Sequence, residues 1–123
     1  MARVAPFTIP KESVEILKKH TAGGNLFNSV RYGGYLIWTL YPKWRPIIDG
    51  RLVIRSARQF AGYLRVLDQP ERFRAYHDNY DFAAAVLPAT GRYRRLVRHL
   101  YDDPGWSLAY TDGTQVLFVP GES

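Results

Sequence analysis

The chain has 123 residues, a formal charge of +6 and an isoelectric point near 9.8. That length suits one domain with a single core, and a hydrophobic fraction of 46% excludes a disordered chain. The absence of cysteine excludes disulfides and thiolate metal sites, and the positive charge favours phosphate, nucleic acid or an acidic membrane surface over cationic partners. No apolar run approaches the ~20 residues of a membrane-spanning helix. Taken as it stands the sequence predicts a soluble cytoplasmic protein, whereas an excised domain of a longer chain would change that prediction.

The first predicted helix runs from Lys11 to His20, with Val14 and Leu17 on its apolar face. Residues 25–51 then follow the pattern of one complete strand, helix, strand unit. Leu26 and Phe27 begin a short strand, residues 35–40 form a helical apolar run, and residues 46–48 form a second buried strand. Such a βαβ unit predicts two neighbouring parallel strands.

Two helices and a strand are predicted next. Residues 57–67 have helical spacing, and the apolar stripe that we predict comprises Ala57, Phe60, Ala61, Leu64 and Leu67. Residues 71–78 predict a short helix that buries Phe73 and Tyr76. Residues 82–88 form an unalternating apolar run closed by proline, which is typical of a parallel strand buried on both faces.

Residues 91–102 predict the clearest amphipathic helix, whose core side comprises Tyr93, Leu96, Val97, Leu100 and Tyr101. An Asp-Gly turn between residues 106–110 and 115–119 predicts an antiparallel hairpin at the end of the chain. The whole chain, residues 1–123, is therefore predicted to be a single α/β domain. Its expected architecture is three-layer and Rossmann-like, with a small mainly parallel sheet, helices on both faces and a C-terminal β-hairpin.

Polar residues follow directly after the predicted parallel strands: Asn28, Ser29, Arg31, Asp49, Arg51 and Thr90. Because the carboxyl ends of parallel strands meet at one edge of a sheet, these side chains could converge there. We predict Asn28, Arg31, Asp49 and Arg51 as candidate ligand-binding residues, in which the arginines bind an anion and Asp49 accepts from a sugar hydroxyl or holds one arginine. The alternative is structural, with Asp49 bonding backbone amides of the Asp-Gly turn.

Four arginines on the last predicted helix form a second candidate site, for contact with an anionic surface: Arg92, Arg94, Arg95 and Arg98. Anionic lipid headgroups need no base-reading element, whereas no reading motif accompanies these arginines, which argues against nucleic acid. A solvated helix face is the alternative. The glycines at 33 and 34 match no dinucleotide or phosphate-loop fingerprint, and we interpret them as packing glycines. The three histidines lie on different predicted helices, so neither a metal nor another cofactor is expected.

Four sequence blocks carry a resemblance to a known family: residues 25–28 (NLFN), 33–38 (GGYLIW), 40–42 (LYP) and 48–51 (IDGR). They resemble the C-terminal soluble domain of large polytopic bacterial membrane proteins, which are themselves similar to GT-C glycosyltransferases of the oligosaccharyltransferase and protein mannosyltransferase type. The resemblance covers nearly the whole chain, since the remaining predicted elements fall in the same order.

The resemblance implies an extracytoplasmic domain detached from a membrane-embedded part of the same polypeptide. That part would hold any active site, which would use a lipid-phosphate sugar donor, and no catalytic residue is implied in this domain. The expected function is accessory: positioning a glycan substrate, or docking on anionic lipid headgroups. The other hypothesis is a freestanding basic protein that binds nucleotides or nucleic acid, motivated by the charge and the βαβ pattern.

Overall fold

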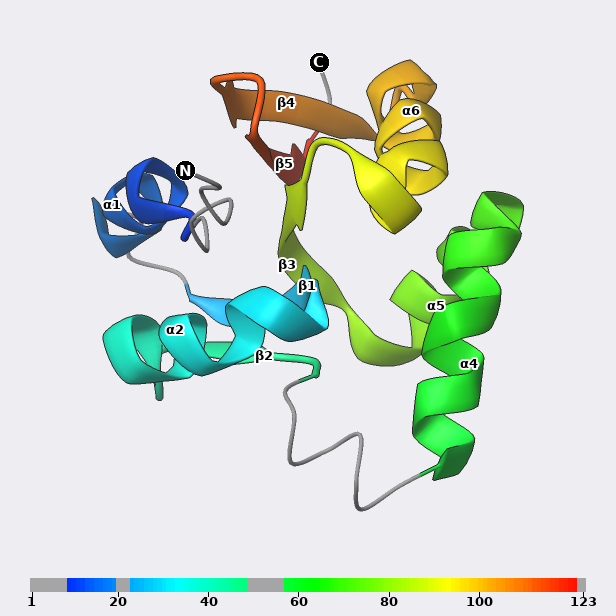
Figure 1. The fold of residues 1–123 in the computed structure, drawn as a ribbon, viewed down its shortest axis with the longest axis horizontal. Coiled ribbons are helices and arrows are strands. Elements are labelled where there is room, and N and C mark those ends of the chain that lie inside the picture. Colours follow the sequence, from blue (N-terminus) through cyan, green and yellow to red (C-terminus); the bar gives the residue numbers. More distant parts are fainter. Residues whose placement is uncertain (1–8, 20–22, 49–56, 122–123) are drawn as a thin grey trace, which may run out of the picture.

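A computed structural model describes residues 9–19, 23–48 and 57–121 of the chain (Figure 1). In chain order the elements are α1 (Lys11–Lys19), β1 (Gly24–Asn28), α2 (Val30–Leu40), β2 (Trp44–Pro46), α4 (Ala57–Asp68), η1 (Pro70–Arg72), α5 (Phe73–Tyr80), β3 (Phe82–Pro88), η2 (Gly91–Tyr93), α6 (Arg94–Asp102), β4 (Trp106–Thr111) and β5 (Gln115–Pro120). The two η elements are single turns of 3-10 helix. The predicted α/β class is confirmed.

The strands form one five-stranded mixed sheet in the order β2-β1-β3-β5-β4. β1 pairs in parallel with β2 on one side and with β3 on the other, so the predicted strand, helix, strand unit is present as β1, α2 and β2. β5 runs antiparallel to both β3 and β4. The parallel half of the sheet therefore comes from residues 24–88, and the antiparallel pair β5 and β4 forms the opposite edge.

Helices cover both faces of this sheet (Figure 1). Successive residues of a strand point to opposite faces, so Leu26 packs with α1 and α2, whereas Phe27 packs with α4 and α5. β3 alternates in the same way, with Val86 on the first face and Leu87 on the second. Both faces of β1 and β3 are apolar because both are covered, as predicted for residues 82–88.

Aromatic rings dominate the core on the second face. The Phe27 ring lies 5.3 Å from that of Tyr63, 5.2 Å from that of Phe73 and 5.4 Å from that of Phe82, measured between centroids. Aromatic pairs at such distances contribute about 0.5–1.5 kcal/mol each beyond the area they bury. The core on the first face is mainly aliphatic, with Leu17, Leu36 and Leu117 at its centre. The aromatic core fixes how α4 and α5 sit on the sheet.

β2 lies two residues earlier than predicted. Its three residues pair with β1 from Gly24↔Trp44 to Leu26↔Pro46, and the predicted strand residues Ile47 and Ile48 follow it. Trp44 explains the shift, since its ring is 3% exposed and its Nε1 donates to the Leu17 carbonyl at 3.1 Å. Burying this large ring and satisfying its N–H anchors the strand at residue 44.

Two predicted helix faces were wrong in part. On α4 the buried residues are Tyr63, Val66 and Leu67, whereas Ala61 faces solvent and the side chain of Ala57 lies outside the described part of the chain. The aromatic core recruits the larger side chains, which rotates α4 relative to the predicted stripe. On α6 Tyr101 is 68% exposed and borders a hollow with Leu108 of β4, so it is not part of the core.

Candidate functional site

The topology creates one switch point at the carboxyl ends of the parallel strands. The chain leaves β1 into α2, which covers the first face, and leaves β3 into η2 and α6, which cover the second face. Because the two exits from adjacent strands diverge, a crevice between them is the usual ligand position in an open α/β sheet. The residues at these two exits therefore decide whether a site exists there.

Asn28, at the end of β1, is fully buried and its side chain bonds only to backbone groups in the contacts around it. Its Nδ2 donates to the carbonyl oxygens of Ser29 at 2.8 Å and Ile48 at 2.9 Å, and its Oδ1 accepts from the Ile47 N–H at 2.9 Å. These bonds tie the exit of β1 to the exit of β2. The amide thus has a structural task at the position where a ligand contact was predicted.

Two tyrosines connect the exits of the two strands. The Tyr63 hydroxyl donates to the Asn28 carbonyl oxygen at 2.5 Å, so it accepts from the Tyr93 hydroxyl 2.9 Å away. Tyr93 in turn accepts from the Val30 N–H at 3.4 Å. Burial raises the pKa of Tyr63 well above its ordinary value, and the neighbouring Tyr93 raises it further. The Tyr63 hydroxyl is therefore neutral at physiological pH, and the two hydroxyls connect α4, η2 and the start of α2.

These tyrosines were missed as site residues by sequence reasoning. Tyr93 was predicted only as part of a core stripe, and Tyr63 was left out of the stripe of its helix. The usable signal was the spacing of Tyr63 three residues from Phe60 and from Val66, which places all three on neighbouring positions of one helix face. That spacing indicates burial and gives no sign of the hydroxyl partners.

The other predicted edge residues do not assemble into a described site. Arg31 is exposed in the first turn of α2, and Thr90 is exposed after β3. Asp49 and Arg51 lie outside the residues that the structure describes, so their candidate roles stay predictions. Ser29, by contrast, is the N-cap of α2, and its hydroxyl accepts from the Tyr32 N–H at 3.2 Å.

The four predicted surface arginines do gather in one place, at η2 and the first turns of α6. With the end of α4 they border an open hollow of about 760 Å³, here called the arginine groove, lined by Arg92, Arg94, Arg95, Arg98, Leu67, Asp68, Pro70, Gly91 and His99. All four arginine side chains are exposed. The groove thus combines a small apolar floor with a strongly basic rim.

Asp68 is the acidic residue of this groove, and it engages two of the arginines. Its Oδ1 lies 3.5 Å from an Arg92 Nη, and its backbone carbonyl oxygen accepts from Arg95 Nη1 at 3.3 Å. Arg94 and Arg98, one helical turn apart, also line a second hollow of about 410 Å³ between α6 and the β4–β5 pair. Their position on the ridge between two hollows makes them the arginines best placed to meet an incoming anion.

The start of α6 concentrates positive charge. The first turn holds Arg94 and Arg95 and no acidic residue, although the amino end of a helix already carries about half a positive charge from its aligned peptides. Basic residues there cost stability, whereas acidic residues would add it. A bound anion would offset both the macrodipole and the arginines, so this end of α6 is electrostatically suited to one.

Histidines and carboxylates give no metal site in the described part of the chain. The His77 ring packs on Phe73, Phe82 and Trp106, and its Nδ1 accepts from the Phe82 N–H at 3.0 Å. This is the environment of a core histidine. His99 borders the arginine groove, and His20 lies outside the described residues.

None of the helices described here is both long and apolar enough to cross a lipid bilayer. No family model, curated protein or solved structure matches this chain. The surface chemistry and the sequence resemblance are therefore the features that point to a function.

Proposed function

We propose that this chain is an accessory domain of a larger glycosyltransferase-like membrane protein, lying on the extracytoplasmic side and holding an anionic substrate group without catalysing its transfer. The four resembling sequence blocks support the parent, and the arginine groove supports the anionic group. Three of the blocks correspond to β1, α2 and the exit from α2, which form the centre of the fold.

The observation that carries the proposal is the position of Arg94 and Arg98. Their guanidinium groups rim two adjacent hollows at a helix start with no acidic residue in its first turn. Guanidinium groups bind phosphate and carboxylate through paired hydrogen bonds, and the nearby Asp68 is engaged by Arg92 and Arg95. A phosphate or acidic sugar is the ligand class that this arrangement fits.

The fold supports a finer inference as well. The order β2-β1-β3 with parallel pairing is the order of the first strands in flavodoxin-like doubly wound folds. We therefore infer a Rossmann-like relationship for this half of the sheet, with the antiparallel pair β5 and β4 as the addition at its edge. In such folds the switch point holds the ligand, and here the hydroxyls of Tyr63 and Tyr93 bond between the two strand exits while the basic surface continues from Tyr93 along α6.

One observation favours the second candidate function, a freestanding nucleic-acid-binding protein. The exposed ring of Tyr101 lies one turn from Arg98 and Val97 on α6, and an exposed aromatic beside arginines is a stacking platform for a base. The helical pattern predicts this ring in the core, so its exposure is a finding of the structure. Binding of an oligonucleotide that weakens steeply with salt and requires Tyr101 would favour this candidate.

The test compares two double variants with the same change in charge. Arg94→Gln/Arg98→Gln removes the two arginines of the ridge, and Arg58→Gln/Arg65→Gln removes two exposed arginines of α4. Inorganic pyrophosphate is titrated into each 123-residue protein, and backbone amide shifts are followed by NMR. We expect shifts centred on residues 91–98 that disappear only in the first variant. Equal loss in both variants, or shifts elsewhere, would contradict the proposal.

The membrane parent is tested separately, by sequencing the source locus upstream of the codon for Ala2. An open frame that continues through several apolar segments of ~20 residues supports the accessory-domain proposal. A stop codon close upstream would contradict it and leave the nucleic-acid-binding candidate.

A further inference from the structure

The outer face of α2 exposes large aromatic side chains. The Trp38 side chain is 81% exposed and that of Tyr41, three residues further along, is 60% exposed. Residues three apart lie on one side of a helix, so the two rings belong to a single surface. The other two tryptophans differ, since Trp44 is 3% and Trp106 is 9% exposed. Trp38 is thus the tryptophan that a partner could reach.

Gly34 enlarges this surface. It is exposed in the middle of α2, and a Cβ added there would meet nothing within 4 Å, so packing does not require glycine at this position, contrary to the sequence interpretation. Trp38 lies four residues later, and helical side chains lean towards the preceding turn. A glycine therefore leaves room for the indole to lie along the helix beside Tyr35, whose ring centroid is 6.3 Å away.

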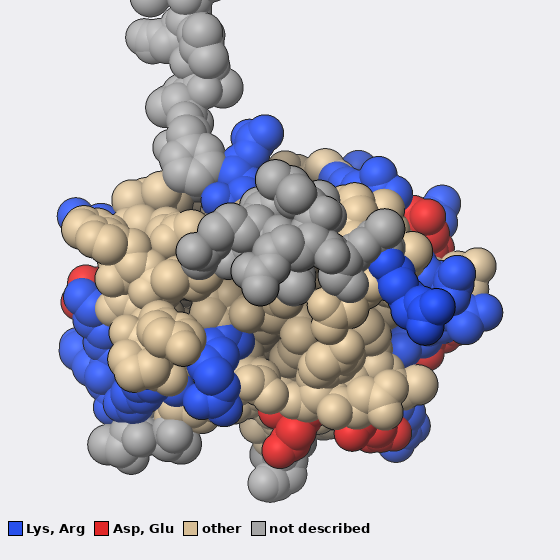
Figure 2. All heavy atoms as spheres, turned by 90° about the horizontal axis from the view of Figure 1, so that it is seen from below, with Lys and Arg blue, Asp and Glu red and all other residues tan. Residues whose placement is uncertain are grey.

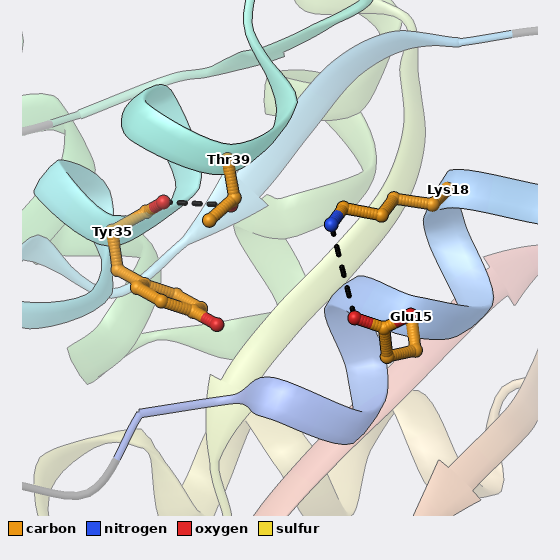
Figure 3. Close-up of polar contacts among 4 residues, drawn as sticks. All are labelled: Glu15, Lys18, Tyr35 and Thr39. Atoms are coloured by element: carbon orange, nitrogen blue, oxygen red, sulfur yellow. Dashed lines mark hydrogen bonds and ion pairs between the residues drawn. The ribbon is translucent and has the colours of Figure 1, made fainter.

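The surroundings of these rings are basic. No aspartate or glutamate occurs between Glu15 and Asp49, whereas that stretch contains Lys18, Lys19, Arg31, Lys43 and Arg45. All five are exposed, but Arg45 follows the buried Trp44 on β2 and points to the opposite face of the sheet, where it donates to Asn25 Oδ1 at 3.1 Å. Lys18 meets Glu15 on α1 at 3.8 Å, next to Tyr35 and Thr39 of α2 (Figure 3). In Figure 2 the left side of the molecule, where α1 and α2 lie, shows blue Lys and Arg atoms around tan projections, with little red.

We propose that this aromatic and basic face of α2 docks on the surface of an anionic lipid bilayer. Trp and Tyr partition to the boundary between lipid headgroups and acyl chains, because one end of each ring system is apolar and the other hydrogen-bonds. Lys and Arg beside them add attraction to anionic headgroups. Exposed tryptophan and tyrosine with lysine and arginine beside them satisfy both requirements, and the occupant that fits is lipid with acidic headgroups.

This docking orients the domain. α2 covers one face of the sheet and α6 the other, so a bilayer against α2 leaves the arginine groove turned away from the lipid. The inference deepens the proposed function, since it places the groove where a substrate of the parent protein could reach it from the aqueous side. Docking itself is measured on lipid alone, so its failure is distinguishable from failure of anion binding at the groove.

The first experiment follows tryptophan fluorescence of the 123-residue protein mixed with vesicles of phosphatidylcholine and phosphatidylglycerol. We expect a blue shift of the emission and quenching by brominated acyl chains, both lost in Trp38→Ala, with vesicle affinity lowered roughly tenfold or more because one tryptophan no longer enters the interface. Absence of the shift, or an unchanged shift in Trp38→Ala, would overturn the proposal.

The second experiment separates the two basic surfaces by vesicle co-sedimentation. Arg31→Gln/Lys43→Gln and Arg94→Gln/Arg98→Gln change the net charge equally, and Arg31 lies two turns before Trp38 on the same side of α2. At about 1 kcal/mol per basic residue near an anionic bilayer, the first pair should weaken vesicle binding roughly 30-fold. The second pair should change it little. The reverse ranking, or equal affinity for vesicles of phosphatidylcholine alone, would overturn the proposal.

Two controls keep these outcomes interpretable. Arg31 lies in the first turn of α2, so a melting curve of the Arg31→Gln/Lys43→Gln protein must show an intact fold. Sedimentation equilibrium without lipid tests whether the same face joins two copies of the chain. A dimer that Trp38→Ala dissociates would overturn lipid docking, and a monomer at the concentrations of the vesicle assay supports it.

Discussion

The outer face of α2 and the arginine groove on α6 are both basic, yet they are built differently. The α2 face presents Trp38 and Tyr41 with basic residues at its margin, whereas the groove presents guanidinium groups over a small apolar floor. Binding at the groove should be electrostatic and should weaken steeply as salt is added. Binding at α2 should keep an apolar part that salt does not screen.

The comparison shows that net charge alone does not define a partner. Both surfaces contribute to the charge of +6. The side chains beside the cations distinguish a surface suited to bilayers from one suited to soluble anions. The sheet holds the two surfaces apart, and the switch point between β1 and β3 is where the elements that carry them meet.

Asn28→Ala should have the largest effect on stability, because Asn28 lies where the elements that carry the two surfaces meet. The substitution leaves the Ile48 carbonyl without its side-chain donor, at a cost of about 1–3 kcal/mol, and removes one of the two acceptors of the Ile47 N–H, which also donates to the Leu26 carbonyl at 2.9 Å. Urea unfolding measures the loss. Asn79→Ala, at an exposed position of α5, is the matched control and should change the midpoint little. A stable Asn28→Ala protein that had lost only ligand binding would instead restore the predicted ligand role of Asn28.

Tyr63→Phe should act on the α6 side more than on the α2 side. It removes the hydroxyl that joins the Asn28 carbonyl to the Tyr93 hydroxyl, and we expect a loss of about 1–3 kcal/mol from these buried groups. Hydrogen exchange should accelerate at the amides of residues 91–98 while those of residues 31–40 change less. Uniform acceleration of exchange along the chain would show that the Tyr63 hydroxyl does not stabilise the α6 side selectively. Tyr41→Phe is the exposed control.

Gly34→Ala should affect only the α2 side, and it should stabilise the protein. Alanine exceeds glycine in helix propensity by about 1 kcal/mol, and the added methyl group has open space around it. Thermal unfolding should show a higher midpoint, with pyrophosphate binding at the groove unchanged. If the methyl group also weakens vesicle binding, the indole of Trp38 needs the space above Gly34. An unchanged or lower midpoint would contradict the argument from propensity.

Asp112→Asn should have the smallest effect and should act on neither surface. The pKa of Asp112 is lowered to about 2 from 3.8 because its carboxylate accepts from the Thr114 hydroxyl at 2.7 Å and from the Thr114 N–H at 2.9 Å. A lowered folded-state pKa means that the stabilisation is complete above the unfolded value, near 3.8, and is lost as the pH falls towards about 2. Between pH 3.8 and about pH 2, the urea midpoint should fall more steeply with decreasing pH for the natural protein than for Asp112→Asn. Parallel curves would contradict the assignment.

Much of the fold followed from local pattern. The βαβ unit, the buried strand β3 and the arginine-rich face of α6 were predicted from apolar periodicity, since period and strand length are properties of a short stretch of chain. The clustering of Arg92, Arg94, Arg95 and Arg98 was predictable for the same reason: residues at helical spacing share a face whatever packs on the opposite side.

Tertiary structure decided what each polar or aromatic residue at those positions does. Asn28 bonds the backbone beyond β2, Tyr63 and Tyr93 connect the two strand exits, and Trp44 is buried whereas Trp38 is exposed. Each outcome depends on a partner far along the chain. A local sequence pattern does not show which distant residues come close together in space. An aromatic ring or an amide suits core and surface alike, so its neighbours alone determine whether it holds the fold together or remains available to a ligand.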